Sequence, residues 1–121
     1  MTIAVWIVSG LVALVYLMAG GRKLVTPEAK LPETFPFVEV TGVRWLRVIG
    51  ALEVLGAIGV IVPALTGIVP ILTPIAAVGL ALVQVGAIIL HVRRGEFKVL
   101  PANVVLLLLP AFVAVARFAG F

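Results

Sequence analysis

The sequence contains no cysteine, only one histidine and only five acidic residues among its 121 residues. The lack of cysteine excludes disulfides, thiolate metal sites and cysteine-based redox relays within this chain. One histidine and five carboxylates also leave little from which to build a metal centre. If the protein takes part in redox chemistry, a bound cofactor or another subunit must therefore carry the electrons.

Charged residues make up only 12% of the chain, whereas 64% of it is hydrophobic. A soluble domain of this size could not bury so much apolar surface. Four apolar stretches cover residues 3–21, 48–65, 71–90 and 99–116, and each is close to the roughly 20 residues that cross a bilayer core. The sequence therefore predicts an all-α fold, a transmembrane four-helix bundle that forms a single membrane domain over residues 1–121.

The net charge of +4 is interpreted as a set of orientation signals and lipid-headgroup contacts, not as a nucleic-acid surface. Basic residues gather in the first connection, 22–47, and in the third, 91–98, while the second, near 63–70, has no charge. The positive-inside rule then predicts that 22–47 is a cytoplasmic loop and that both termini lie outside. Arg117, near the outer end of the last span, is the exception.

The first connection contains Pro27, Pro32 and Pro36 and shows little helical pattern over roughly residues 24–43. It is expected to be an ordered or partly re-entrant loop whose apolar segment, residues 35–38, touches the membrane surface. Small residues predict where helices approach one another closely. They lie in the second span at Gly50, Gly56, Ala57 and Gly59, and in the third at Gly79, Gly86 and Ala87.

Polar residues inside the spans fall into helical stripes. Ser9, Tyr16 and Lys23 are seven residues apart, as are Gln84 and His91, and such stripes should face the bundle interior because lipid offers no hydrogen bonds. Glu53 follows Arg47 by six residues, which at a rise of about 1.5 Å per residue places it about 9 Å deeper in the membrane. The predicted topology places Lys23, His91 and Asn103 at the cytoplasmic ends of their spans, with Tyr16 and Gln84 about two turns deeper. One polar chamber is therefore expected to contain six ligand-binding candidates: Tyr16, Lys23, Glu53, Gln84, His91 and Asn103.

Two interpretations of Glu53 remain open at this point. An intramembrane carboxylate needs a partner, so Glu53 can serve a structural role by pairing with Lys23, Arg47 or His91. Alternatively, it can act as a proton carrier or general acid. His91 likewise suits either a helix C-terminal cap or acid–base chemistry.

Three runs of sequence resemble the DoxX-like membrane proteins: WLRVIGALEVLGAIG at 45–59, PIAAVGL at 74–80 and GAIILHVRRGE at 86–96. The first-helix pattern ending in Gly20 and Lys23 is similar too. The resemblance implies a four-helix bundle in the bacterial cytoplasmic membrane. The family takes its name from a subunit linked to thiosulfate oxidation with quinone as acceptor, and other members are associated with redox stress systems.

Three functions are then expected as alternatives. In the first, the protein binds a lipophilic small molecule, with quinone favoured, as an accessory to redox metabolism; Glu53, His91 and Gln84 bond the ligand oxygens. In the second, a membrane enzyme isomerises or hydrolyses a lipophilic substrate, with Glu53 and His91 as catalytic acid and base. In the third, the bundle is a scaffold for another subunit. The expected partners are the bilayer, the lipophilic molecule, and a second copy or a redox protein.

Overall fold

The computed structural model describes residues 2–121; Met1, the first residue of the predicted domain, lies outside the described residues. The long helices are α1 (Thr2–Val25), α3 (Val38–Thr66), α4 (Leu72–Arg93) and α5 (Leu100–Phe118). Between α1 and α3 lie the 3₁₀ turn η1 (Glu28–Lys30) and the short helix α2 (Leu31–Thr34), and η2 (Phe97–Val99) precedes α5. Over residues 2–121 the chain contains helices and no strand, which confirms the predicted all-α class.

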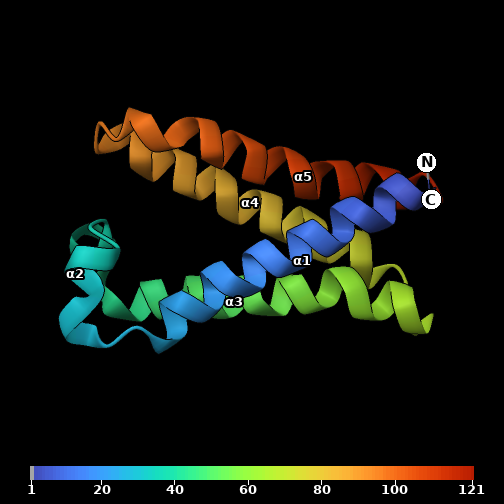
Figure 1. Ribbon diagram of the computed structural model, residues 1–121, viewed down its shortest axis with the longest axis horizontal. Coiled ribbons are helices and arrows are strands. Elements are labelled where there is room, and N and C mark those ends of the chain that lie inside the picture. The colour runs from blue at the N-terminus through green and yellow to red at the C-terminus, as the bar shows by residue number, and fades with distance from the viewer. Residues whose placement is uncertain (1) are drawn as a thin grey trace.

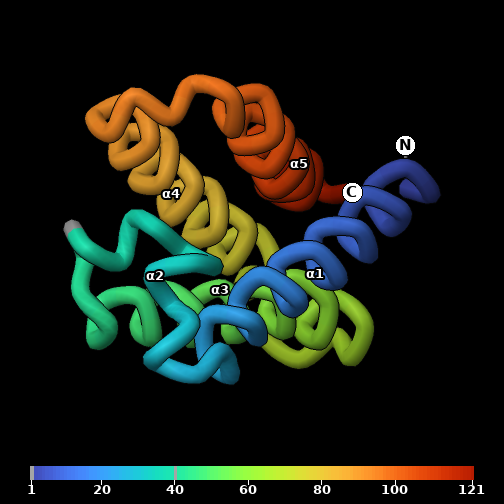
Figure 2. Tube along the Cα trace, turned by 60° about the vertical axis from the view of Figure 1, so that its left-hand side comes forward, coloured from blue at the N-terminus to red at the C-terminus, as the bar shows by residue number. Residues whose placement is uncertain are grey.

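The long helices alternate in direction and form a bundle (Figure 1). α1 packs against α3 and α5, α3 packs against α4, and α4 packs against α5, so that each long helix contacts two others. Both chain ends and the α3–α4 turn lie at one end of the bundle. The α2 segment and the α4–α5 connection lie at the other end (Figure 2). We call this second end the α2 end.

Four helical segments are long and apolar enough to cross a membrane: Thr2–Val25, Thr41–Thr66, Leu72–Arg93 and Phe97–Phe118. Their outer faces carry exposed large apolar side chains, among them Leu14, Leu55 and Leu82. The interior is a narrow cluster of buried apolar residues around Tyr16, Val60 and Leu80. Apolar side chains on the outside of a bundle are the arrangement that lipid stabilises and water does not.

The first connection differs from its prediction, because helix occupies both of its ends. α1 continues to Val25, and α3 begins at Val38 instead of near residue 48. Gly42 introduces a kink near the start of α3. Its φ of +79° is a backbone conformation that residues with a side chain rarely adopt. The short segment before the kink packs back on the helix, so that Leu31, Val38 and Leu46 form a second buried cluster. Pro32 is compatible with α2 because it lies in the first turn.

The predicted glycine contacts are correct for α3 and incorrect for two positions of α4. A Cβ on Gly56 would lie 2.5 Å from Leu80, and one on Gly59 would lie 2.8 Å from the Cβ of Ala76. Gly79 and Gly86 have no atom within 4 Å of such a Cβ among the described residues. Gly79 is exposed on α4, and Gly86 lines the cavity described below. The presence of a small residue alone does not reveal which of these surroundings it has.

Candidate functional site

The Lys23 side chain from α1 and the Glu53 side chain from α3 form an ion pair inside the bundle. Lys23 Nζ lies 2.6 Å from Glu53 Oε1, and the exposed fractions of the two side chains are 13% and 5%. The helices can approach this closely because Gly20 and Gly50 face one another. A Cβ on Gly20 would lie 2.5 Å from the carbonyl oxygen of Gly50. Of the three partners that the sequence allowed for Glu53, namely Lys23, Arg47 and His91, the structure pairs it with Lys23.

Arg47, another candidate partner for Glu53, instead binds the end of α1. Its guanidinium donates to the carbonyl oxygen of Lys23 at 2.6 Å and to that of Thr26 at 2.8 Å. These carbonyls belong to the last turn of α1 and just beyond it, where intrahelical donors run out. The Phe35 ring lies beneath Lys23 Nζ, 5.5 Å from its centroid. Arg47 and Phe35 therefore fix the position of Lys23, and through it the position of Glu53.

A second polar group connects α1, α4 and α5 deeper in the bundle. The Tyr16 hydroxyl lies 2.6 Å from the carbonyl oxygen of Leu106, to which it donates, and 3.3 Å from Gln84 Oε1. Gln84 Nε2 donates to Asn103 Oδ1 at 2.7 Å. Asn103 Nδ2 is buried and has no hydrogen-bond partner among the described residues. The Asn103 amide nitrogen is therefore an unsatisfied hydrogen-bond donor of this group.

His91 belongs to a third group, which closes the α2 end. Its Nδ1 lies 2.9 Å from Glu96 Oε1, and Arg94 Nε donates to the same oxygen at 3.0 Å. The Arg94 guanidinium also pairs with Glu39 at the start of α3. The Phe37 and His91 rings form a T-shaped pair with 5.9 Å between their centroids. We call Glu39, His91, Arg94 and Glu96 the latch.

The latch is electrostatically reinforced. The hydrogen bond from His91, together with the neighbouring Arg94, lowers the pKa of Glu96 below its ordinary value. The hydrogen bond to Glu39 raises the pKa of Arg94. Both shifts favour the ionised forms that make the contacts. The latch therefore joins the start of α3 to the α4–α5 connection across the α2 end.

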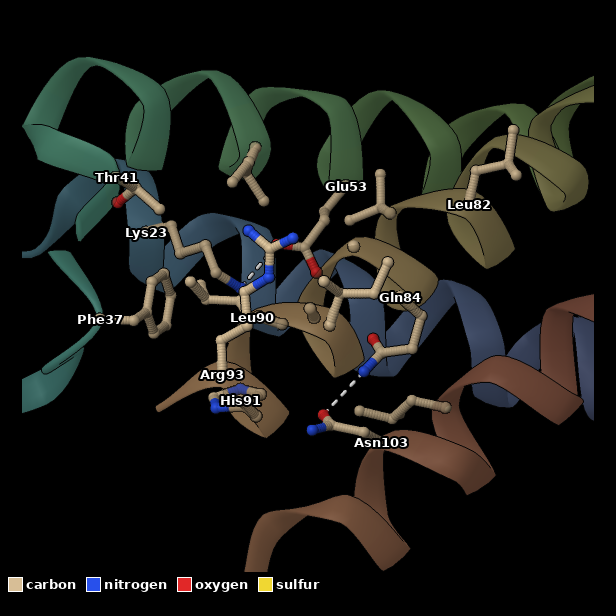
Figure 3. Close-up of a pocket in the computed structure, with 17 residues that line it drawn as sticks. Lys23, Phe37, Thr41, Glu53, Leu82, Gln84, Leu90, His91, Arg93 and Asn103 are labelled. Carbon is tan, nitrogen blue, oxygen red and sulfur yellow. Dashed lines mark hydrogen bonds and ion pairs between the residues drawn. The ribbon is translucent and has the colours of Figure 1, made fainter. Parts of the chain in front are cut away.

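A cavity of about 510 Å³ opens between α3 and α4 and reaches α1 and α5. Its wall is mostly apolar, with side chains such as Ile49, Val83 and Leu106. Figure 3 shows the polar side chains that line it, with Arg93 extending into the cavity on the side of the Lys23–Glu53 pair. Five of the six residues predicted to share a chamber line this cavity: Lys23, Glu53, Gln84, His91 and Asn103.

Tyr16, the sixth predicted residue, lies behind the wall and holds Gln84 and the α5 backbone. Glu53 and His91 line the same cavity, but each is bonded to a different partner, Lys23 and Glu96. The binding and catalytic roles assigned to these residues stay predictions. The geometry shows that both line one cavity.

Several residues around the cavity were not found from the sequence. Arg93, Phe37 and Thr41 line it, and Glu96 and Glu39 hold the latch. The sequence feature that could have located Glu96 is Gly95, which follows the basic end of α4 and has a φ of +72°. The chain then turns back, so that the Glu96 N–H donates to the His91 carbonyl at 2.9 Å. A glycine after a helix end typically produces this motif.

Comparison with known proteins identifies one relationship. Residues 7–113 match the model of the DoxX-like family, which covers most of the chain, all of α3 and α4, and most of α1 and α5. Neither a curated protein nor a solved structure matches the chain. The match includes the Lys23–Glu53 pair and every helix that lines the cavity. Together with the four helices long and apolar enough to span a bilayer, it makes the chain a multi-pass membrane protein that belongs to the DoxX-like family.

Proposed function

We propose that this protein binds a lipophilic small molecule of the quinone class in the cavity between α3 and α4. The observation that carries the proposal is the composition of the cavity wall: about 510 Å³ of mostly apolar surface with a few polar side chains grouped at the α2 end. Ligand sites typically combine these two features at this size. A quinone ring and tail would contact the apolar wall, and its oxygens would meet the polar groups.

The polar groups suit a ligand that carries acceptor oxygens. Lys23 and Arg93 supply donors at one side of the cavity, and the Gln84–Asn103 pair lies at another (Figure 3). Lys23 already neutralises Glu53, so an uncharged oxygen can approach the ammonium without bringing its own counter-charge. With Arg93 the cavity has one positive charge more than the Lys23–Glu53 pair balances, and a ligand with two separated acceptor oxygens, such as a quinone, suits these donors.

The Asn103 amide gives a reason for preferring a redox-active ligand. With Asn103 Oδ1 bonded to Gln84, its Nδ2 is a buried donor without a partner among the described residues. A quinone carbonyl would satisfy this donor once the Asn103 side chain, which lines the cavity, turns Nδ2 toward the ligand. If both amides rotate by half a turn, Gln84 donates to the Tyr16 hydroxyl, Asn103 Nδ2 donates to Gln84, and Asn103 Oδ1 becomes free. That free acceptor suits a quinol hydroxyl. The same pair can therefore bond both redox forms.

We place the protein in the bacterial cell membrane, with the cavity on the cytoplasmic side and both termini outside, because basic residues concentrate at the α2 end. The chain has no cysteine, so the electrons would come from a redox partner protein. Its role would be to hold the quinone as an accessory to redox metabolism, alone or as a homo-oligomer.

The test is to identify by mass spectrometry the small molecules that travel with gently purified protein. We compare wild type with Glu53→Gln, which keeps the shape of the side chain but removes the charge beside Lys23. The matched control is Glu33→Gln, the same chemical change at an exposed position of α2 away from the cavity. Size-exclusion profiles establish that all three are folded.

We expect a quinone to accompany wild type and Glu33→Gln and to be strongly reduced in Glu53→Gln. A different lipophilic species with the same pattern would keep the site and replace the ligand class. Only bulk phospholipid in all three proteins would contradict the proposal and favour a scaffold role.

A further inference from the structure

The end of the bundle opposite the α2 end holds a second cavity, of about 410 Å³, beside Arg117 near the end of α5. Its other walls come from the end of α3, the α3–α4 turn, the start of α4 and the residues after α5, including Ala64, Pro70, Pro74 and Phe121. Figure 1 shows that these segments share one end of the bundle with the start of α1. Nothing in the proposed function uses this cavity.

Arg117 is separated from the acidic residues of the chain. Glu28, Glu33, Glu39 and Glu96 lie in or beside the two connections at the α2 end. The fifth acid, Glu53, is paired with Lys23. Arg117 is thus a partly buried cation that pairs with no acidic side chain among the described residues. A charge withdrawn from water in this way requires compensation.

The Arg117 guanidinium also has hydrogen-bond donors without an acceptor among the described residues. Its Nη1 donates to the main-chain oxygen of Phe121 at 2.5 Å, and Cζ lies over the face of the Trp6 ring, 4.5 Å from the ring centroid. Nε and Nη2 are buried and have no hydrogen-bond partner within the described part of the chain. A guanidinium presents a planar set of donors that matches a phosphate or carboxylate.

We infer that this cavity binds a phosphate-bearing amphiphile, an anionic phospholipid, whose phosphate pairs with Arg117 while its apolar part lies against the proline-lined wall. Two observations support this choice. The cation lies at the end of helices that span the bilayer, where lipid phosphates are found. The remaining wall is apolar, which suits a lipid better than a fully hydrated anion.

The position of Trp6 under the guanidinium provides a local reporter. The chain has two tryptophans, Trp6 and Trp45. Trp45 is exposed, and in the variant Trp45→Phe all tryptophan fluorescence comes from Trp6. This protein is reconstituted in phosphatidylcholine nanodiscs with increasing fractions of phosphatidylglycerol. A parallel series adds inorganic phosphate to nanodiscs of phosphatidylcholine alone. Arg117→Gln and Arg44→Gln are tested in the same background; Arg44 is an exposed arginine at the α2 end.

We expect a saturable change in Trp6 emission with phosphatidylglycerol, unchanged in Arg44→Gln and about tenfold weaker in apparent affinity in Arg117→Gln, as for loss of one charged hydrogen-bonding group. The same Arg117-dependent change with inorganic phosphate would keep the phosphate site and make the free anion its ligand. An absent response, or an equal one in Arg117→Gln, would overturn the inference. If Arg117→Gln does not fold, Arg117→Lys replaces it. The loss of the planar donor set should then weaken the response several-fold, and an unweakened response would equally overturn the inference.

Discussion

Lys23 Nζ lies 2.6 Å from Glu53 Oε1, although the two residues belong to different helices and both side chains are largely withdrawn from solvent. A surface ion pair contributes little to stability, but here each charge is held where the other is its main compensation. The pair also forms part of the wall of the cavity between α3 and α4. Its two roles, holding α1 against α3 and shaping the cavity, can be separated by substitution.

Replacing Lys23 with methionine should destabilise the protein by about 3–5 kcal/mol, because Glu53 would stay buried without its counter-charge. The double variant Lys23→Met/Glu53→Gln removes both charges and should recover most of that loss. Thermal unfolding of the two variants in detergent, followed by circular dichroism, checks the prediction. A double variant that is no more stable than Lys23→Met would show that the two residues contribute independently.

Two adjacent glycines at the end of α1 should respond oppositely to alanine. A Cβ on Gly20 would meet the Gly50 carbonyl at 2.5 Å and Glu53 Cβ at 2.9 Å, and backbone cannot yield as a flexible side chain can. We expect Gly20→Ala to cost about 1–3 kcal/mol and to loosen the Lys23–Glu53 pair.

Gly21→Ala is the matched control, because no atom of the described chain lies within 4 Å of its Cβ position. It should be neutral or stabilising by up to about 1 kcal/mol, as expected when alanine replaces glycine within a helix. Equal losses of unfolding free energy in the two variants would contradict the close approach of α1 and α3.

The sequence predicted the bundle and much of the cavity because helical periodicity is a local property. The seven-residue spacing was enough to turn Ser9, Tyr16 and Lys23 inward, and both Ser9 and Tyr16 are buried. It was not enough to choose the partner of Glu53, since Arg47 lies nearby on the same helix but bonds to the end of α1. That choice depends on how α1 and α3 are rotated against one another. The same reason explains why the close helix contact expected at Gly79 is absent among the described residues.

Stability should depend on pH through the latch at the α2 end. The hydrogen bond from His91, with Arg94 beside it, lowers the pKa of Glu96 below the ordinary value near 4.5. A carboxyl with a lowered pKa in the folded state stabilises that state above its ordinary pKa, and the contribution is lost as pH falls through the lowered value. His91, Arg94 and, through Arg94, Glu39 are the titratable groups that face it.

The measurement is the unfolding temperature of wild type and Glu96→Gln from neutral pH to below pH 4. Wild type should be the more stable protein at neutral pH, and the difference should shrink as Glu96 becomes protonated. A difference that stays constant over this range would show that the ionised form of Glu96 does not stabilise the latch.

The Asn103 amide allows a test of whether one polar pair serves both redox forms of a quinone. Asn103→Leu removes the amide at similar volume and leaves Gln84 without the acceptor for its Nε2. If Asn103 bonds the ligand as donor in one amide orientation and as acceptor in the other, affinities for a short-chain quinone and for its quinol should both fall, by about tenfold.

Binding is measured by equilibrium dialysis of each form in detergent. Ser9→Ala controls for loss of a buried polar group elsewhere, since the Ser9 hydroxyl donates within α1, to the Val5 carbonyl oxygen. A loss confined to the quinone would mean that the amides keep one orientation, with Asn103 as a permanent donor. Unchanged binding of both forms would remove Asn103 from the site.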